Sequence, residues 1–136
     1  MQAPKSSKPS SDNSQIESVG QIHISVTDID RAVAFYRDVL ELKFLFQVQG
    51  QPMAFFDCGG VRLYLGVPSD PKYKSNSFLY YRVGDISEAY KRLVKNGVKF
   101  LGEPRLIHKT DTSELWMAGF QDPDGNYAQI MSERPV

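Results

Sequence analysis

The sequence has little that would support a disulfide, a membrane span or a nucleic-acid surface. Cys58 is the only cysteine, which excludes an intramolecular disulfide and fits a reducing compartment, so we expect a cytoplasmic protein. No run approaches the roughly 18 consecutive apolar residues of a membrane span, and the first 18 residues have no apolar core of a secretory signal. Lys plus Arg and Asp plus Glu both number 16, so we expect neither nucleic acid nor an anionic membrane as partner.

The length suits one folded domain with a tail. A chain of 136 residues can form one real core but is short for two. The Ser, Pro and Lys content of residues 1–18 is typical of a disordered segment, which we exclude from the fold. We therefore expect a single domain over residues 19–136, divided into a first module (19–68), a polar linker (69–77) and a second module (78–134).

One internal repeat organises this domain. The stretch "VTDIDRAVAFY" from Val26 and the stretch "VGDISEAYKRL" from Val83 match at Val, Asp, Ile and Ala with an offset of 57 residues. Apolar and polar residues alternate just before each stretch, as in a strand with one apolar face. Within the stretches, apolar residues recur at helical spacing: Ile29, Ala32, Val33, Tyr36 and Leu40, then Ile86, Ala89, Tyr90, Leu93 and Val94. Asp28 and Asp85 can cap these helices, and Gly97 suits the end of the second.

Strand-like runs separated by turn residues follow each helix. They are "KFLFQV", "MAFFDC" and "VRLYLGV" in the first copy, and "VKFLG", "ELWMAGFQ" and "YAQIMS" in the second. The segment "DPDGN", residues 122–126, is most simply a turn joining the last two. Each half is therefore expected to be β-α-β-β-β.

In its motifs the sequence resembles the vicinal oxygen chelate superfamily of glyoxalase, bleomycin-resistance and extradiol dioxygenase proteins. The resemblance lies in "VTDIDRAVAFYRDVLELKFLF", "FFDCGGVRLYL" and "FQDPDGNYAQIM", taken in order and together with the repeat. It implies an α+β fold in which two tandem βαβββ modules form a partly open mixed β-barrel with an internal concave cleft, usually in a homodimer. Relatives usually have Gly where Glu41 stands, and a left-handed Glu there would cost about 1 kcal/mol relative to Gly.

The resemblance also implies where a metal would bind. Metal-dependent relatives place His or Gln on the first strand, Glu on the fourth, His on the fifth and Glu on the eighth. The matching positions here are Gln21, Tyr64, Phe78 and Gln129, a set without carboxylate or imidazole. Neutral amides return little Coulomb energy for dehydrating a divalent ion. We therefore expect the usual metal site to be absent and favour no cofactor.

His23 lies two residues beyond the expected first ligand and, by strand alternation, on the same face. Three interpretations remain open: a metal ligand, a polar contact or proton carrier for a bound molecule, and a hydrogen-bonded structural residue. An imidazole titrates near neutral pH, so a chemical role is available to it. If the protein is an enzyme, His23 and Tyr64 are the candidate catalytic residues.

Strand alternation predicts an aromatic-rich concave face that also carries amides, one imidazole and two guanidinium groups. Its candidate ligand-binding residues are Gln21, His23, Ser25, Arg62, Tyr64, Phe78, Tyr80, Arg82, Tyr127 and Gln129. Such a face suits a small planar ligand that is neutral or partly anionic. The same rings could also be core, and the arginines could be solvated or paired with nearby acids. Trp116 could line the cleft or a dimer seam, and we expect His108 in an exposed loop.

Three functions are consistent with these residues. The first is a protein that binds a small organic molecule without the usual metal, sequestering it or acting on it through His23 and Tyr64. The second is a glyoxalase- or dioxygenase-type enzyme with Zn, Ni, Mn or Fe on an unorthodox set built around Gln21, His23 and Gln129. The third is an interaction module with a vestigial pocket. We favour the first.

Overall fold

The computed structural model describes residues 13–75 and 77–136, so most of the tail predicted over residues 1–18 lies outside the described residues. The first module contains β1 (Gln21–Ser25), α1 (Ile29–Ala34), the π-helical turn η1 (Phe35–Val39), β2 (Lys43–Gln47), β3 (Met53–Cys58) and β4 (Val61–Gly66). A short 3₁₀ turn, η2 (Pro71–Tyr73), interrupts the linker. The second module contains β5 (Leu79–Arg82), α2 (Ile86–Lys95), β6 (Arg105–Lys109), β7 (Ser113–Gln121) and β8 (Tyr127–Pro135).

Each module forms its own mixed sheet of four strands, with the order β1-β4-β3-β2 in the first and β5-β8-β7-β6 in the second. The first and last strands of each module pair in parallel, and the other pairs are antiparallel. This arrangement confirms the predicted α+β fold of two βαβββ modules. Across the described part of the chain the two sheets share no strand pair, so they do not close into a barrel within one chain.

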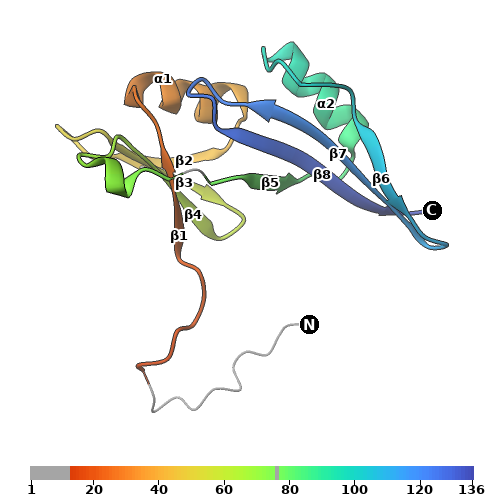
Figure 1. Cartoon of the computed structure of the whole chain (residues 1–136), viewed down its shortest axis with the longest axis horizontal. Coiled ribbons are helices and arrows are strands. Elements are labelled where there is room, and N and C mark those ends of the chain that lie inside the picture. The colour runs from red at the N-terminus through yellow and green to blue at the C-terminus, as the bar shows by residue number, and fades with distance from the viewer. Residues whose placement is uncertain (1–12, 76) are drawn as a thin grey trace.

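The helices cover one face of the sheets because their apolar stripes need a partner surface. Figure 1 shows α1 and α2 on the same side of the molecule, above their sheets. Ala32, Val33 and Tyr36 of the predicted first stripe are buried, and Asp28 caps α1 by accepting from the Arg31 backbone N–H at 3.1 Å. Beyond Ala34 the helix widens, and Leu40 N–H bonds to the Phe35 carbonyl at 2.9 Å. No helix in the described ranges is long and apolar enough to cross a membrane.

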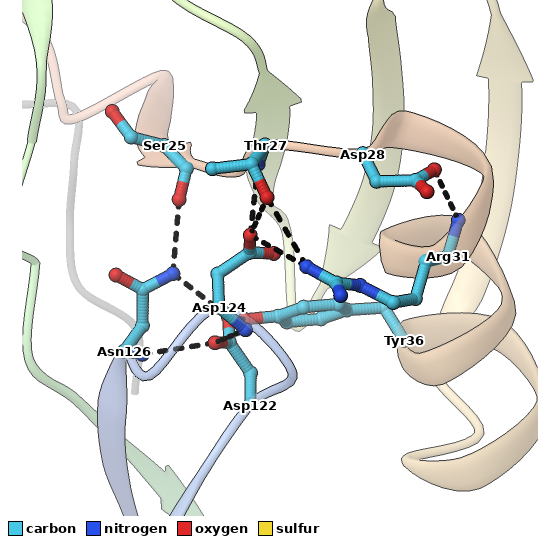
Figure 2. Close-up of polar contacts among 8 residues, drawn as sticks. All are labelled: Ser25, Thr27, Asp28, Arg31, Tyr36, Asp122, Asp124 and Asn126. Atoms are coloured by element: carbon cyan, nitrogen blue, oxygen red, sulfur yellow. Dashed lines mark hydrogen bonds and ion pairs between the residues drawn. The ribbon is translucent and has the colours of Figure 1, made fainter.

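The "DPDGN" turn does more than reverse the chain, because it docks onto the first module where β1 leads into α1 (Figure 2). Asp124 accepts hydrogen bonds from the Thr27 backbone N–H at 2.8 Å and from Arg31 Nη2 at 3.0 Å. Its side chain is only 5% exposed. Asn126 Nδ2 donates to the Ser25 carbonyl at 2.9 Å. The turn therefore fixes the end of β1 relative to the second sheet.

Tyr36 adds a buried contact to the same junction. Its hydroxyl donates to Asp122 Oδ2 at 2.8 Å, and both residues are buried. Burial, followed by the electrostatic effects of Tyr81 and then Asp122, raises the pKa of Tyr36 well above its ordinary value. Asp122 also accepts from the Asp124 and Asn126 backbone N–H groups at 2.9 Å, so one carboxylate organises the turn and binds the first helix.

Glu41 is the one described non-glycine residue with positive φ, at 62°. The predicted left-handed conformation is therefore present. Its carboxylate accepts from Arg92 Nε at 3.0 Å and from Asn96 Nδ2 at 2.7 Å, both in the second module. These hydrogen bonds, with that from Arg92 first, lower the pKa of Glu41. A residue that is costly at this φ thus links the two modules.

The prediction for the sixth strand was wrong. "VKFLG" contributes only an isolated bridge between Phe100 and Phe120, while β6 lies later, at Arg105–Lys109. All five residues of β6 are exposed, so the strand carries no alternating pattern of burial that would reveal it. His108 is exposed as predicted, but it lies in this strand and not in a loop.

Candidate functional site

A row of four rings crosses the first sheet on the face opposite α1. His23, Tyr64, Phe55 and Phe46 come from β1, β4, β3 and β2 and are neighbours in the strand register. Successive ring centroids are 4.7, 5.0 and 4.7 Å apart, with the Tyr64–Phe55 and Phe55–Phe46 pairs stacked. Phe55 is 7% exposed and Phe46 is 45% exposed, so the row is closed in its middle and open at its β2 end. The inner rings of the row cover one another's faces, so the open ring of Phe46 offers the most surface for a further ring to stack on.

Gly66 fixes where the Tyr64 ring lies. A Cβ built on Gly66 would be 2.8 Å from Cε1, Cζ and the hydroxyl oxygen of Tyr64, so the ring covers the glycine backbone. Real side chains do not approach this closely, and any larger residue would push the ring away. A tyrosine two residues before a glycine at the end of a strand is the sequence signal for this arrangement.

His23 has one nitrogen engaged and one without a partner. Its Nε2 lies 3.0 Å from Ser25 Oγ, and Ser25 Oγ also accepts the Ser75 backbone N–H at 2.7 Å. Nδ1 is buried and has no hydrogen-bond partner. Burial lowers the pKa of His23, while the Tyr64 backbone carbonyl acts more weakly in the other direction. The imidazole is therefore neutral at neutral pH, and Ser25 is occupied by these contacts.

Gln21 and Arg62 form a polar pair at the other end of β1 and β4. Arg62 Nε donates to Gln21 Oε1 at 3.0 Å, and the guanidinium carbon lies 5.0 Å from the centroid of the Phe55 ring. The pair brings a fixed positive charge over the Phe55 ring, in the middle of the row. The oxygen that Gln21 would offer to a metal accepts this hydrogen bond and lies beside a positive charge.

The predicted residues of the second module form a separate group. Phe78 stacks on Tyr80 and on Tyr127 with centroid distances of 5.4 and 6.1 Å. All three rings are about half exposed. Tyr80 pairs with Gln129 in the strand register, and Gln129 pairs with Gly119. Gly119 thus stands where Phe55 stands in the first module, so this sheet carries no ring row. Arg82 forms an ion pair with Glu133 at 3.3 Å.

The two groups do not meet within one chain. In residues 13–75 and 77–136, no ring of the first group contacts a ring of the second. The structure therefore assembles the predicted concave face as two half-sites. Trp116 belongs to neither, because its Nε1 donates to Glu114 at 3.0 Å and Arg134 lies over its ring.

The resemblance to metal-dependent relatives marks four ligand positions, namely Gln21 and Tyr64 in the first module and Phe78 and Gln129 in the second. Gln21 pairs with Arg62 and His23 with Tyr64 in the first module. In the second module Tyr80 pairs with Gln129, and just before this ladder the Phe78 ring stacks on the Tyr127 ring. Each module thus presents its two candidate positions with the same stagger. Within the described ranges, no group of three or more His, Cys, Asp or Glu could hold a metal ion. An amide bound to arginine, a tyrosine, a phenylalanine and a second amide do not fit a divalent cation.

A pocket of about 560 Å³ adjoins the β1 end of the ring row. We name it the His23 pocket, and it is lined by His23, Gln51, Pro52, Met53, Tyr64, Val67, Pro68, Ser69 and Tyr73. Sequence reasoning found His23 and Tyr64 but missed the walls, which come from the β2–β3 turn and the linker. The Pro and Gly content of these segments indicates turns but not the hollow between them.

A second pocket, of about 620 Å³, lies between the modules. It takes Leu40 and Cys58 from the first module and Tyr80, Arg82 and Phe120 from the second. Cys58 is half-buried, and burial raises the pKa of its thiol. Two predicted site residues, Tyr80 and Arg82, therefore line this pocket and not the His23 pocket.

Comparison with known proteins gives one family and several relatives. The family model described as Glyoxalase/Bleomycin resistance protein/Dioxygenase superfamily matches residues 18–130. A protein named metallothiol transferase FosB from Staphylococcus saprophyticus is 30% identical over 121 residues, covering 85% of this chain and 76% of that protein. Another of that name from Lysinibacillus sphaericus is 28% identical over 117 residues, covering 82% and 79%.

Solved structures have the same fold. A superfamily member from Sphaerobacter thermophilus superposes with a TM-score of 0.72 at 28% identity, covering 86% of this chain and 98% of that one. A lactoylglutathione lyase from Agrobacterium tumefaciens superposes with a TM-score of 0.67 at 21% identity, covering 87% and 95%. At that identity the second likeness concerns the fold alone.

Proposed function

Because the chain belongs to the glyoxalase/bleomycin resistance protein/dioxygenase superfamily, we propose that it binds a small organic molecule on its aromatic face without the metal site of metal-dependent relatives. Proteins of one fold carry out different chemistry, so the function must come from the residues of the site. We assign to the binding site the ten residues predicted from the sequence, with His23 and Tyr64 at its centre.

The ring row from His23 to Phe46 is the observation that carries this proposal. Rings on the face away from the helix are not needed to fill the core between sheet and helix, which Ile24, Phe56 and Leu63 already occupy. Phe46, Tyr80 and Tyr127 keep about half of their surface exposed. A ligand ring that covers such a surface gains from apolar area and from stacking geometry.

His23 and Tyr64 give the site two groups that can exchange protons with a bound molecule. A neutral imidazole accepts a proton, and a phenol hydroxyl donates one. The two rings are in contact, with centroids 4.7 Å apart. Sequestration requires only the stacking and the hydrogen bonds of this pair. A proton-transfer reaction would use the same pair as base and acid.

The proposal includes a cytoplasmic homodimer. The single cysteine suits a reducing compartment. The two half-sites are open within one chain, and half-exposed rings on both favour a second copy that brings them together. Neither nucleic acid nor a membrane is expected as a partner of a chain with no net charge.

Metal content tests the proposal. Protein purified without an affinity tag is incubated with Ni²⁺, Zn²⁺, Mn²⁺ or Fe²⁺, passed through a desalting column and analysed by elemental mass spectrometry. We expect metal far below one ion per chain for the parent chain and for Gln21→Ala alike. A stoichiometric metal that is lost in Gln21→Ala would contradict the proposal.

One observation favours a second candidate, a metal-dependent transferase or lyase. Relatives at 28 to 30% identity are named metallothiol transferase. This function would need an unorthodox ligand set built around Gln21, His23 and Gln129, and Gln21 would first have to leave Arg62. The same metal measurement separates the two candidates.

A further inference from the structure

We propose that the His23 pocket binds the polar end of a neutral planar molecule whose ring system packs against Tyr64. This inference rests on the proposed function and deepens it, because it says where on the aromatic face the ligand lies and which charge it carries. Neither the family resemblance nor the relatives' names assign these walls a ligand.

The walls of the His23 pocket indicate which charge its ligand carries. None of the nine lining residues is Asp, Glu, Lys or Arg. His23 is the only titratable group among them that could become cationic, and burial favours its neutral form. Charged groups lie only outside these walls, among them Lys72 on the linker, whose Nζ lies 5.1 Å from the Tyr73 ring centroid. An ionic ligand would lose hydration here without gaining a counter-charge.

Other hollows of this protein, unlike the His23 pocket, have charged side chains in their walls. The pocket between the modules contains Arg82 and Arg92. A hollow beside α2 contains Glu88, Lys91 and Lys95 among others, and one beside α1 contains Asp30. Charged side chains therefore line several concave surfaces of this protein but not the one next to His23 and Tyr64.

The walls of the His23 pocket are mostly apolar and carry a few polar atoms. Pro52, Met53, Val67 and Pro68 provide apolar area, while Gln51, Ser69 and His23 provide the polar atoms. Nδ1 of His23 is a buried ring nitrogen without a partner. A few polar groups in a mostly apolar hollow fix the orientation of a small ligand. An amide, carbonyl or hydroxyl group matches this set.

Tyr64 lies in the wall of the His23 pocket, and its position there depends on Gly66. The ring reaches the pocket because Gly66 has no Cβ to hold it away. Gly119, on the corresponding sheet of the second module, would place a Cβ no closer than 3.6 Å to any neighbour. An alanine is therefore accommodated at position 119 but displaces Tyr64 at position 66. The chain offers a variant that alters the pocket and a matched variant that does not.

Three matched probes test the inference: naphthalene carboxamide, carboxylate and carboxamidine, which share one ring system and are neutral, anionic and cationic near neutral pH. Binding is followed by NMR of methionine methyl groups labelled with ¹³C. Met53 lines the His23 pocket, whereas Met117 and Met131 pair with each other in β7 and β8 of the second module. The four methionines are few enough to assign by substitution with leucine.

We expect the carboxamide to shift the Met53 methyl signal and to bind at least about tenfold more tightly than either ion. Gly66→Ala should weaken this binding by about tenfold, and Gly119→Ala should leave it unchanged. Unchanged Met117 and Met131 signals in Gly66→Ala, and an unchanged Met53 signal in Gly119→Ala, show that the fold is intact, because each methionine lies in the module that is not substituted. Ser69→Asp, on the exposed rim, should shift the preference to the carboxamidine.

Three outcomes overturn the inference. If an ion binds most tightly in the parent chain, the charge assignment is wrong. If the probes shift Met117 or Met131 but not Met53, the location is wrong while the proposed function stands. If no probe shifts any methionine, both the inference and the proposed function fail for planar ligands.

Discussion

His23 and Tyr64 lie directly opposite each other in the parallel pair β1–β4, with ring centroids 4.7 Å apart. The contact begins a row of rings that continues through Phe55 and Phe46. Parallel pairing of a first and a last strand thus brings two residues 41 positions apart in the sequence into one surface. The predictions below follow from this contact and from the junction between the modules.

Tyr64→Ala should weaken binding of naphthalene carboxamide by more than about tenfold, because it removes the central ring of the row. Tyr64→Phe keeps the ring and removes only the hydroxyl, so the loss should be less than about fivefold. Isothermal calorimetry measures both affinities. Equal losses for the two substitutions would show that the hydroxyl, and not the stacking surface, provides the binding.

His23 should make the fold less stable in mild acid. Burial lowers its pKa in the folded state below the ordinary value of 6.5, so the unfolded chain binds the proton more readily. The neutral imidazole contributes its full stabilisation above about pH 6.5, and this contribution is lost as the pH falls through the folded-state pKa of His23. Urea unfolding between neutral pH and mild acid should therefore show a steeper loss for the parent chain than for His23→Gln.

The exposed His108 provides the control for this comparison. His108→Gln removes one imidazole at an exposed position and is measured beside His23→Gln. A His23→Gln variant with the same pH dependence as the parent would contradict a depressed pKa at His23. An NMR titration of the His23 ring signals measures the pKa directly.

Asp124→Asn should lower the free energy of unfolding by about 1 to 3 kcal/mol, since a buried acceptor of charge-assisted hydrogen bonds becomes a neutral amide. The side chain is 5% exposed and holds Thr27 and Arg31 of the first module. Asp111→Asn, in the exposed turn between β6 and β7, is the matched control and should change stability by less than about 0.5 kcal/mol. Equal effects of the two substitutions would show that the junction does not depend on Asp124.

Glu41→Gly should be more stable than Glu41→Ala by about 1 kcal/mol, because only glycine adopts a φ of 62° without strain. Both variants lose the contacts to Arg92 and Asn96, so the comparison isolates the backbone. Urea denaturation measures the difference. An alanine variant as stable as the glycine variant would mean that the loop relaxes to negative φ.

Much of the fold was accessible from the sequence because local patterns and tertiary packing agree. The core face of β1 at Ile22 and Ile24, the helical stripe through Tyr36 and the cap at Asp85 all appear in the structure. The left-handed position of Glu41 could also be anticipated from a resemblance to relatives with glycine there.

Other features depend on contacts between distant segments and leave no local signal. β6 is exposed along its whole length, so its residues resemble a polar loop. The carboxylates of Asp122 and Asp124 were expected only to form a turn, but they bind Tyr36 and Thr27 across the module junction. The His23 pocket likewise takes its walls from a turn and a linker that the sequence marks as irregular.

The central claim is that the aromatic face binds a small organic molecule without a metal. The most direct test is the affinity for naphthalene carboxamide, measured for protein stripped with EDTA and again after addition of Ni²⁺, Zn²⁺, Mn²⁺ or Fe²⁺. We predict the same dissociation constant in every case, and the same loss on Tyr64→Ala. Binding that appears only when a metal is present would contradict the account and identify the chain as a metal-dependent member of its superfamily.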